Sequence, residues 1–267
     1  MTMTDNASTT LAPFTGDESP LLFGIEHEYN TGAEREDCGC GDEDCCETYY
    51  SSPSPRPNLP DGWAQHEEHC GWEVKTPPMT DIRAAVATFR DVEEEISEGH
   101  DDCGYHIHLN ADPERGPAVN LAKFHEAWIR HRPTLYRYCP APGGGTGISR
   151  GREYAETLPD DTLRWLNSSE RYLEVNHTAI DAHTTVEVRL AAGTEDYDAF
   201  ERWLRLVIAV GVESLFEGDP LAEYEPWVAQ TTGPWSSILY LNAAGKHLVR
   251  LGNDEAAVRA LAVARAA

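Results

Sequence analysis

Residues 23–29 read FGIEHEY, and the pattern of this stretch decides the expected fold. Successive side chains on a β-strand point to opposite faces, so Glu26 and Glu28 are expected on one face and apolar side chains on the other. A strand of this kind is typical of an antiparallel sheet that packs on a core with one side only. The stretch therefore predicts a sheet whose two faces differ in chemistry.

Four later segments repeat the same alternation of apolar and polar residues. Their polar faces carry Glu73 and Lys75, then His106, His108 and Asn110, then Glu174 and Asn176, and finally Glu187 and Arg189. One such strand would ordinarily turn its polar face to water. Five strands rich in Glu and His instead indicate a cation site, because converging carboxylates repel one another unless cations lie among them. We expect a site for a hard divalent cation such as Mg²⁺, which binds carboxylate, water and phosphate oxygens.

The remaining periodicity predicts helices between strands, and hence an α+β fold with helices packed mainly on one face of one sheet. The predicted strands cover residues 21–29, 71–76, 104–110, 172–178 and 185–190. The predicted helices cover residues 81–97, which Thr80 would cap, 117–138, 197–216 and 254–267. We expect a flexible tail at residues 1–20 and a single domain at residues 21–267, with a Cys-rich insertion at about residues 31–70.

The charge of the chain excludes some classes of partner. Its 267 residues include 46 Asp and Glu against 21 Lys and Arg, for a net charge of −25. Such a chain is not expected to bind nucleic acid or anionic membranes, both of which attract basic proteins. Only Lys75, Lys123 and Lys246 are lysines, which suits a salt-accumulating halophile or a high-GC genome that favours Arg. No membrane span or signal peptide is evident, so a cytoplasmic location is expected.

Five motifs, taken in this order, resemble the amidoligase family of the glutamine synthetase-like carboxylate–amine ligase superfamily. They are FGIEHE (23–28), WEVKTPPM (72–79), CGYHIH (103–108), RYLEVN (171–176) and VEVRLAAGT (186–194). The resemblance implies a curved, mainly antiparallel sheet with metals and ATP on its concave face, and helices on the other face. It also implies an ATP-dependent ligase that joins a small-molecule or peptide carboxylate to an amine through an acyl phosphate.

The resemblance further implies roles for individual residues. Two or more Mg²⁺ ions would be held by Glu26, Glu28, Glu73, His106 and Glu187. Of these, Glu73 would complete the metal nearer the acyl phosphate, and His106 with Glu187 would hold the metal that bridges the nucleotide phosphates. The residues expected to act most directly in catalysis are Arg189, Glu28 and Glu187.

Several basic residues are expected to contact the nucleotide. The resemblance gives this role to His108, and it assigns Arg189 to the charge of the transferring phosphoryl group. Lys75 departs from the family, which often has an apolar residue there, and could contact phosphate or neutralise Glu73. Arg150 and Arg152 follow a glycine loop at residues 143–147 and could close over a triphosphate, or could be surface residues paired with Glu.

The sequence is also compatible with two other functions. His106 and His108 would also suit a metal-dependent hydrolase that uses the same strands. Cys38, Cys40, Cys45 and Cys46 have the ligand type of a structural Zn²⁺ site, although free thiols or a reversible disulfide would also account for them. A zinc-stapled binding protein without catalytic activity is therefore the third alternative.

Overall fold

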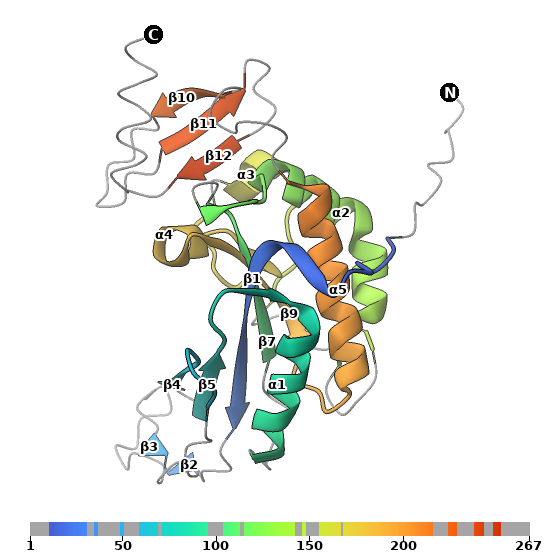
Figure 1. The fold of residues 1–267 in the computed structure, drawn as a ribbon. Helices are drawn as coiled ribbons and strands as arrows, with labels where there is room; N and C mark the ends of the chain where they lie inside the picture. The colour runs from blue at the N-terminus through green and yellow to red at the C-terminus, as the bar shows by residue number, and fades with distance from the viewer. Residues whose placement is uncertain are drawn as a thin grey trace.

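An open antiparallel sheet of seven strands organises the molecule (Figure 1). Its strand order is β4 (Ala64–Glu68), β5 (Gly71–Lys75), β1 (Glu18–Asn30), β7 (Gly104–Asn110), β9 (Thr185–Ala192) and β8 (Val175–Asn176), and β6 (Met79–Asp81) also pairs with β1. The computed structural model describes residues 11–30, 35–36, 49–50, 59–68, 71–95, 104–112, 115–141, 146–147, 155–166, 168–215, 224–228, 238–242 and 248–251.

The long helices cover the apolar face of this sheet. They are α1 (Ile82–Glu95), α2 (Leu121–Tyr138) and α5 (Tyr197–Glu213), of which α1 and α5 pack on β1 and α2 packs on α5. The shorter helices are α3 (Thr162–Leu166), next to α2, and α4 (Ala179–His183), next to β9. Further strand pairs are β2 (Arg35–Glu36) with β3 (Tyr49–Tyr50), and β11 (Ile238–Asn242) with both β10 (Tyr224–Val228) and β12 (Leu248–Leu251).

The alternation of side chains explains why the core lies on one side of the sheet. Phe23, Ile25 and Ile107 are almost completely buried against the helices, whereas the charged residues between them point the other way. Phe89 of α1 and Phe200 of α5 complete an aromatic cluster around Tyr105 of β7. Each such side chain contributes on the order of 2 kcal/mol when it leaves water, so the apolar face fixes which way the polar face points.

The α+β class and the antiparallel pairing are confirmed, whereas the concave, glutamine synthetase-like form of the sheet stays a prediction. The sheet is open, with β4 at one end of the strand order and β8 at the other. On its polar face α4 and the residue before it contribute to the pocket, which Thr178, Ala179 and His183 line together with the strand residues. A short helix on the polar side of the sheet therefore covers part of the pocket.

Several predicted boundaries also shift, for local reasons. Asp81, and not Thr80, accepts the hydrogen bond from the backbone N–H of Ala84 at the start of α1. The helix expected from residue 117 begins at Leu121, because the Asn120 side chain accepts from the Lys123 N–H and caps it. The strand expected at residues 172–178 shrinks to Val175–Asn176, and the helix expected at residues 254–267 lies outside the described residues.

The N-terminal segment joins the fold earlier than the sequence indicated. β1 begins at Glu18, within the residues expected to form a tail, and the Arg205 guanidinium donates hydrogen bonds to the carbonyls of Phe14 and Gly16. The expected division into a tail and a single domain stays a prediction. Among the described residues, no helix is long and apolar enough to cross a membrane.

A close approach between α5 and the sheet gives a test of this packing. A β-carbon on Gly211 would lie 2.9 Å from Cδ1 of Leu109 and 3.4 Å from Cδ2 of Leu21. Gly211→Val should therefore overpack the interface and lower the free energy of unfolding by about 1–3 kcal/mol in urea denaturation. Arg202→Val, on the exposed face of the same helix, should change it by less than about 0.5 kcal/mol, and equal effects would contradict the packing described here.

Candidate functional site

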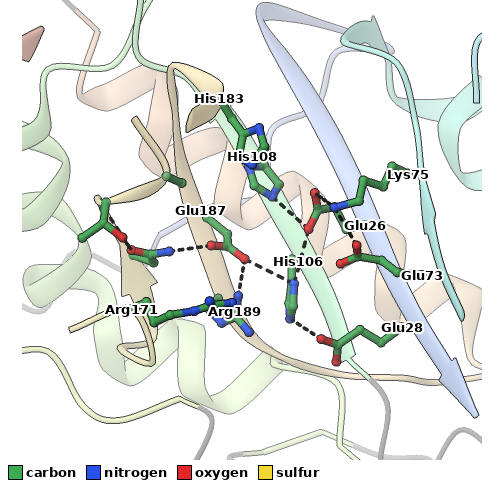
Figure 2. A pocket seen from close by; sticks show the side chains of 13 residues that line it. Glu26, Glu28, Glu73, Lys75, His106, His108, Arg171, His183, Glu187 and Arg189 are labelled. Carbon is green, nitrogen blue, oxygen red and sulfur yellow. Dashed lines mark hydrogen bonds and ion pairs between the residues drawn. The ribbon is translucent and has the colours of Figure 1, made fainter. Parts of the chain in front are cut away.

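Strand register gathers the predicted polar residues into neighbouring rows across the sheet, of which the two longest pass through Glu26 and Glu187. Glu26 of β1 lies directly opposite Lys75 of β5 on one side and His106 of β7 on the other. Glu28 is opposite Glu73 in the same way. In the second row His108 is opposite Glu187, and Asn176 is opposite Glu187 from the far side. Residues paired across an antiparallel sheet share a face, so these side chains converge (Figure 2).

The converging side chains line an open pocket of about 270 Å³. The predicted site residues that line it are Glu26, Glu28, Glu73, Lys75, His106, His108, Glu187 and Arg189. Its four carboxylates are matched by three basic side chains, because Arg171 also reaches the pocket. The near balance of charge sets this pocket apart from the strongly acidic chain as a whole.

A β-bulge shapes the middle of the site. Tyr105 pairs with Ala191 and Ile107 pairs with Val188, so Arg189 and Leu190 of β9 both lie opposite the single residue His106. Bulges of this kind turn side chains away from their regular direction and occur often beside functional sites. Arg189 reaches the pocket on the same face as Glu187, while Leu190 stays buried.

His106 is the most enclosed member of the site, and carboxylates flank both of its ring nitrogens. Nδ1 lies 3.2 Å from Oε1 of Glu187 and 3.6 Å from Oε2 of Glu26, and Nε2 lies 3.7 Å from Oε1 of Glu28. Burial lowers the pKa of His106, and the nearby Arg189 charge adds to this, so the ring is neutral near pH 7. A neutral imidazole has a proton on one nitrogen and a lone pair on the other, so one nitrogen presents a lone pair to a carboxylate.

The carboxylates of the site ionise unequally. Burial opposes the ionisation of Glu26, but its two histidine neighbours and the Lys75 ammonium outweigh burial and hold the pKa of this carboxyl well below its ordinary value. Burial, together with the charge of Glu26, raises the pKa of Glu73 to about 7. For Glu187, burial again opposes ionisation, but His106 and Arg189 lower its pKa. Glu26 and Glu187, on either side of His106, therefore carry negative charge at neutral pH.

Glu187 is held in place by neighbours on two sides. Its Oε1 accepts a hydrogen bond of 2.5 Å from the Arg189 guanidinium, and its Oε2 accepts one of 2.7 Å from the Asn176 side-chain amide. The Asn176 oxygen in turn accepts from the backbone N–H and the hydroxyl of Thr178. This chain of hydrogen bonds fixes the carboxylate while leaving its Oε1 beside the His106 ring.

Lys75 lies among the carboxylates and does not extend into solvent. Its Nζ is 2.6 Å from Oε2 of Glu73 and 2.9 Å from Oε1 of Glu26, and its side chain is only 27% exposed. Of the two roles expected for this residue, the structure shows the neutralisation of Glu73 directly. The ammonium joins two neighbouring strands by their carboxylates (Figure 2).

The described residues contain two groups with the ligands and spacing of a metal site. One consists of Glu26, His106 and Glu187, and the other of Glu28, Glu73 and His106. In each group the ligand atoms lie within 4.8 Å of one another. The donor set of carboxylates with one imidazole suits Mg²⁺ or Mn²⁺. A cation at either group would also resolve the contact between the His106 lone pair and a carboxylate, so these residues fit the metal that the motifs imply.

Several residues in or beside the pocket were not predicted. His183 of α4 lines the pocket and makes an edge-on contact with His108 at 5.9 Å between ring centres, and the Thr185 hydroxyl lies 2.8 Å from Nδ1 of His108. Arg171 lies over the exposed Tyr172 ring at 5.2 Å. Strand alternation could not find His183, because it belongs to a short helix, but Arg171 begins one of the five motifs.

Two residues expected on the polar face turn elsewhere. Glu174 is completely buried away from the pocket, where its Oε1 accepts from the Leu158 N–H and pairs with Arg132 at 3.1 Å. The expectation that it shares a face with Asn176 is wrong, because the chain bends at residue 174 before the strand begins at Val175. Asn110 does not line the pocket either, since its side chain binds the loop that follows β7.

Other expected contributors cannot be placed. Arg150, Arg152 and the glycines at residues 143–145 lie outside the described residues, as do the proposed zinc ligands Cys38, Cys40, Cys45 and Cys46. The lid and the zinc site both stay predictions.

Comparison with known families now bears on the site. A family model described as a putative amidoligase enzyme matches residues 28–143. This match supports an amidoligase family assignment. It covers Glu28, Glu73, His106 and His108, whereas Glu187 and Arg189 lie beyond it and are joined to these residues by the pairing of β9 with β7. A comparison with curated proteins finds no match.

The raised pKa of Glu73 predicts how its replacement changes stability with pH. Near pH 4.5 and below, folded and unfolded chains both keep this carboxyl largely protonated. The wild-type protein and Glu73→Gln should therefore have similar free energies of unfolding there. Between pH 4.5 and about 7 the unfolded chain loses the proton more readily, so the wild type should lose stability relative to the variant, on the order of 2 kcal/mol.

Urea unfolding with a chelator present, at several pH values and constant KCl, measures this difference. Glu156→Gln supplies the control, because it makes the same substitution at an exposed position outside the pocket. A difference between wild type and Glu73→Gln that stays constant from pH 5 to pH 8 would show that Glu73 ionises normally.

Proposed function

We propose that the protein is an ATP- and Mg²⁺-dependent carboxylate–amine ligase that forms an amide bond through an acyl phosphate. The family match supports a ligase, and the site described above supplies the groups that this chemistry needs. The expected partners are a small-molecule or peptide carboxylate and an amine. The acidic composition favours these over nucleic acid or a membrane surface.

The observation that carries this proposal is the neutral, buried His106 between two groups of carboxylates. This arrangement is costly without a cation, because buried carboxylates repel one another and an imidazole lone pair faces one of them. Either group could hold a cation: the first, Glu26, His106 and Glu187, beside Arg189, or the second nearer the solvent-facing Glu28. Bound Mg²⁺ would neutralise phosphate charge and align the reacting oxygens.

Arg171 and Arg189, which lie on the side of the pocket away from Lys75 (Figure 2), suit a phosphate. Arg189 is fixed by Glu187 and its guanidinium lies 5.8 Å from the Tyr172 ring, while Arg171 is exposed beside the same ring. Two planar guanidinium groups near one another can bind phosphate oxygens in pairs. A pocket of about 270 Å³ is small for a whole nucleotide, so we infer that it receives the phosphates and that the nucleoside extends over its open side.

In the proposed reaction a substrate carboxylate oxygen attacks the γ-phosphorus of ATP, and the bond to the β-phosphate oxygen breaks to release ADP. An amine nitrogen then attacks the acyl carbon of the resulting acyl phosphate. Inorganic phosphate leaves, the nitrogen loses a proton, and an amide remains. The part of the protein is to hold the reacting groups in line and to offset the charge on the phosphoryl oxygens, with Arg189 acting on the transferring group.

The composition suggests where this reaction takes place. Dense surface carboxylates with few lysines suit a cytoplasm that contains concentrated salt, since salt screens their mutual repulsion. The repulsion between such a surface and ATP would also be screened there. Assays are therefore best made in molar KCl.

Replacement of the site residues tests the proposal. Purified protein should release ADP from ATP only when a carboxylate and an amine are both present, and a screen of amino acids, polyamines and peptides would reveal the pair. Glu28→Ala, Glu187→Ala and Arg189→Ala should each lower this rate by at least about 100-fold, because the first two remove proposed metal ligands and the third removes the positive charge beside the transferring phosphoryl group. Glu156→Ala and Arg202→Ala, both on exposed positions, serve as controls and should keep the rate.

Circular dichroism would establish that the variants remain folded. Absence of Mg²⁺-ATP binding by calorimetry at every salt concentration would refute the ligase. Cleavage of amides or phosphoesters with a divalent cation but without nucleotide would instead favour a hydrolase on the same side chains.

A further inference from the structure

We propose that Lys75 serves as a resident cation of the site, in the place of a second divalent ion. Its ammonium occupies the position between Glu26 and Glu73, so the protein without nucleotide binds one divalent cation, in the group formed by Glu26, His106 and Glu187. Any further Mg²⁺ then arrives with the triphosphate. This inference rests on the proposed metal-dependent function and defines how many ions the protein holds by itself.

The position of Lys75 follows from strand pairing and does not depend on a flexible reach. Lys75 lies directly opposite Glu26 across β5 and β1, and two residues from Glu73 on its own strand. Its Nζ lies 2.9 Å from one carboxylate and 2.6 Å from the other, which are the distances of charge-assisted hydrogen bonds. The two carboxylates are only 13% and 6% exposed, so the contacts are poorly screened by water.

The contacts of Lys75 affect the two candidate groups differently. Lys75 binds Oε1 of Glu26, whereas Oε2 of the same carboxylate faces the two histidines. Lys75 therefore leaves Oε2 of Glu26 facing the group formed by Glu26, His106 and Glu187, in which Glu187 is bound by Arg189 and Asn176. In the other group, Glu73 has the ammonium within 2.6 Å of one oxygen, and a divalent ion there would meet a positive charge at close range.

His106 limits the ligands that a second ion could use. Both groups use this ring, one through each nitrogen. A neutral imidazole has a single lone pair and can bind one metal ion. A second ion would therefore rely on Glu28, Glu73 and water, and Glu73 becomes available to it only when Lys75 is removed. The position of Lys75 thus favours the group beside Arg189 over the group that contains Glu73.

Direct metal titration tests the inference without any need for activity. Mn²⁺ would be titrated into the nucleotide-free protein, with free Mn²⁺ followed by its electron paramagnetic resonance signal. Molar KCl would suppress weak binding by surface carboxylates, and only sites with a dissociation constant below about 100 μM would be counted. The wild type should bind one ion, and Lys75→Met should bind two. Lys75→Arg, which keeps the charge, and Lys123→Met, on α2, should each bind one.

A further substitution identifies where the second ion lies. Adding Glu28→Gln to Lys75→Met should return the count to one, because it removes a ligand of the second group. Should Lys75→Met fail to fold by circular dichroism, Lys75→Gln replaces it with the same expectation.

The outcomes separate this inference from the proposed function. Two ions bound by the wild type, or one ion bound equally by the wild type and the folded lysine variants, would overturn the role of Lys75 and leave the ligase proposal standing. No ion bound by the wild type would also overturn the role of Lys75, and calorimetry with Mg²⁺-ATP would then decide separately whether the ligase proposal stands.

Discussion

The structure depends on one constraint, which is that several carboxylates lie close together and partly out of water on one face of a sheet. Such a set is stable only if positive charge lies among its members. Lys75 and Arg189 supply part of this charge, one at each end, and His106 occupies the middle as a neutral ring. The four carboxylates still outnumber the three basic side chains, and this excess is the reason to expect a divalent cation, on which the proposed ligase chemistry depends.

The polar face could be predicted from the sequence because strand alternation is a property of the backbone. FGIEHEY fixed the direction of Glu26 and Glu28, and the same reasoning placed Glu73, His106, His108, Glu187 and Arg189 correctly. It failed at Glu174, where a bend replaces the strand and the side chain enters the core. Alternation holds only along continuous extended chain, and the sequence does not mark where the extended chain stops.

Other features of the site could not be predicted from the sequence, because they depend on tertiary packing. No local pattern places His183 over His108, because that contact depends on how α4 packs beside β9. The bulge opposite His106 likewise arises from the pairing of two strands that lie about 80 residues apart. The motifs identified which residues matter, whereas pairing decided which atoms meet.

The strand order has a consequence for the nascent chain during its synthesis. β1 lies in the middle of the sheet, yet its partner β7 is made about 80 residues later and β9 later still. During synthesis the carboxylates of Glu26 and Glu28 therefore leave the ribosome well before the histidines and the arginine that they face in the finished sheet. Contacts so distant in sequence form slowly. The nascent chain must keep an acidic strand soluble and unpaired, a task for which its charge is well suited.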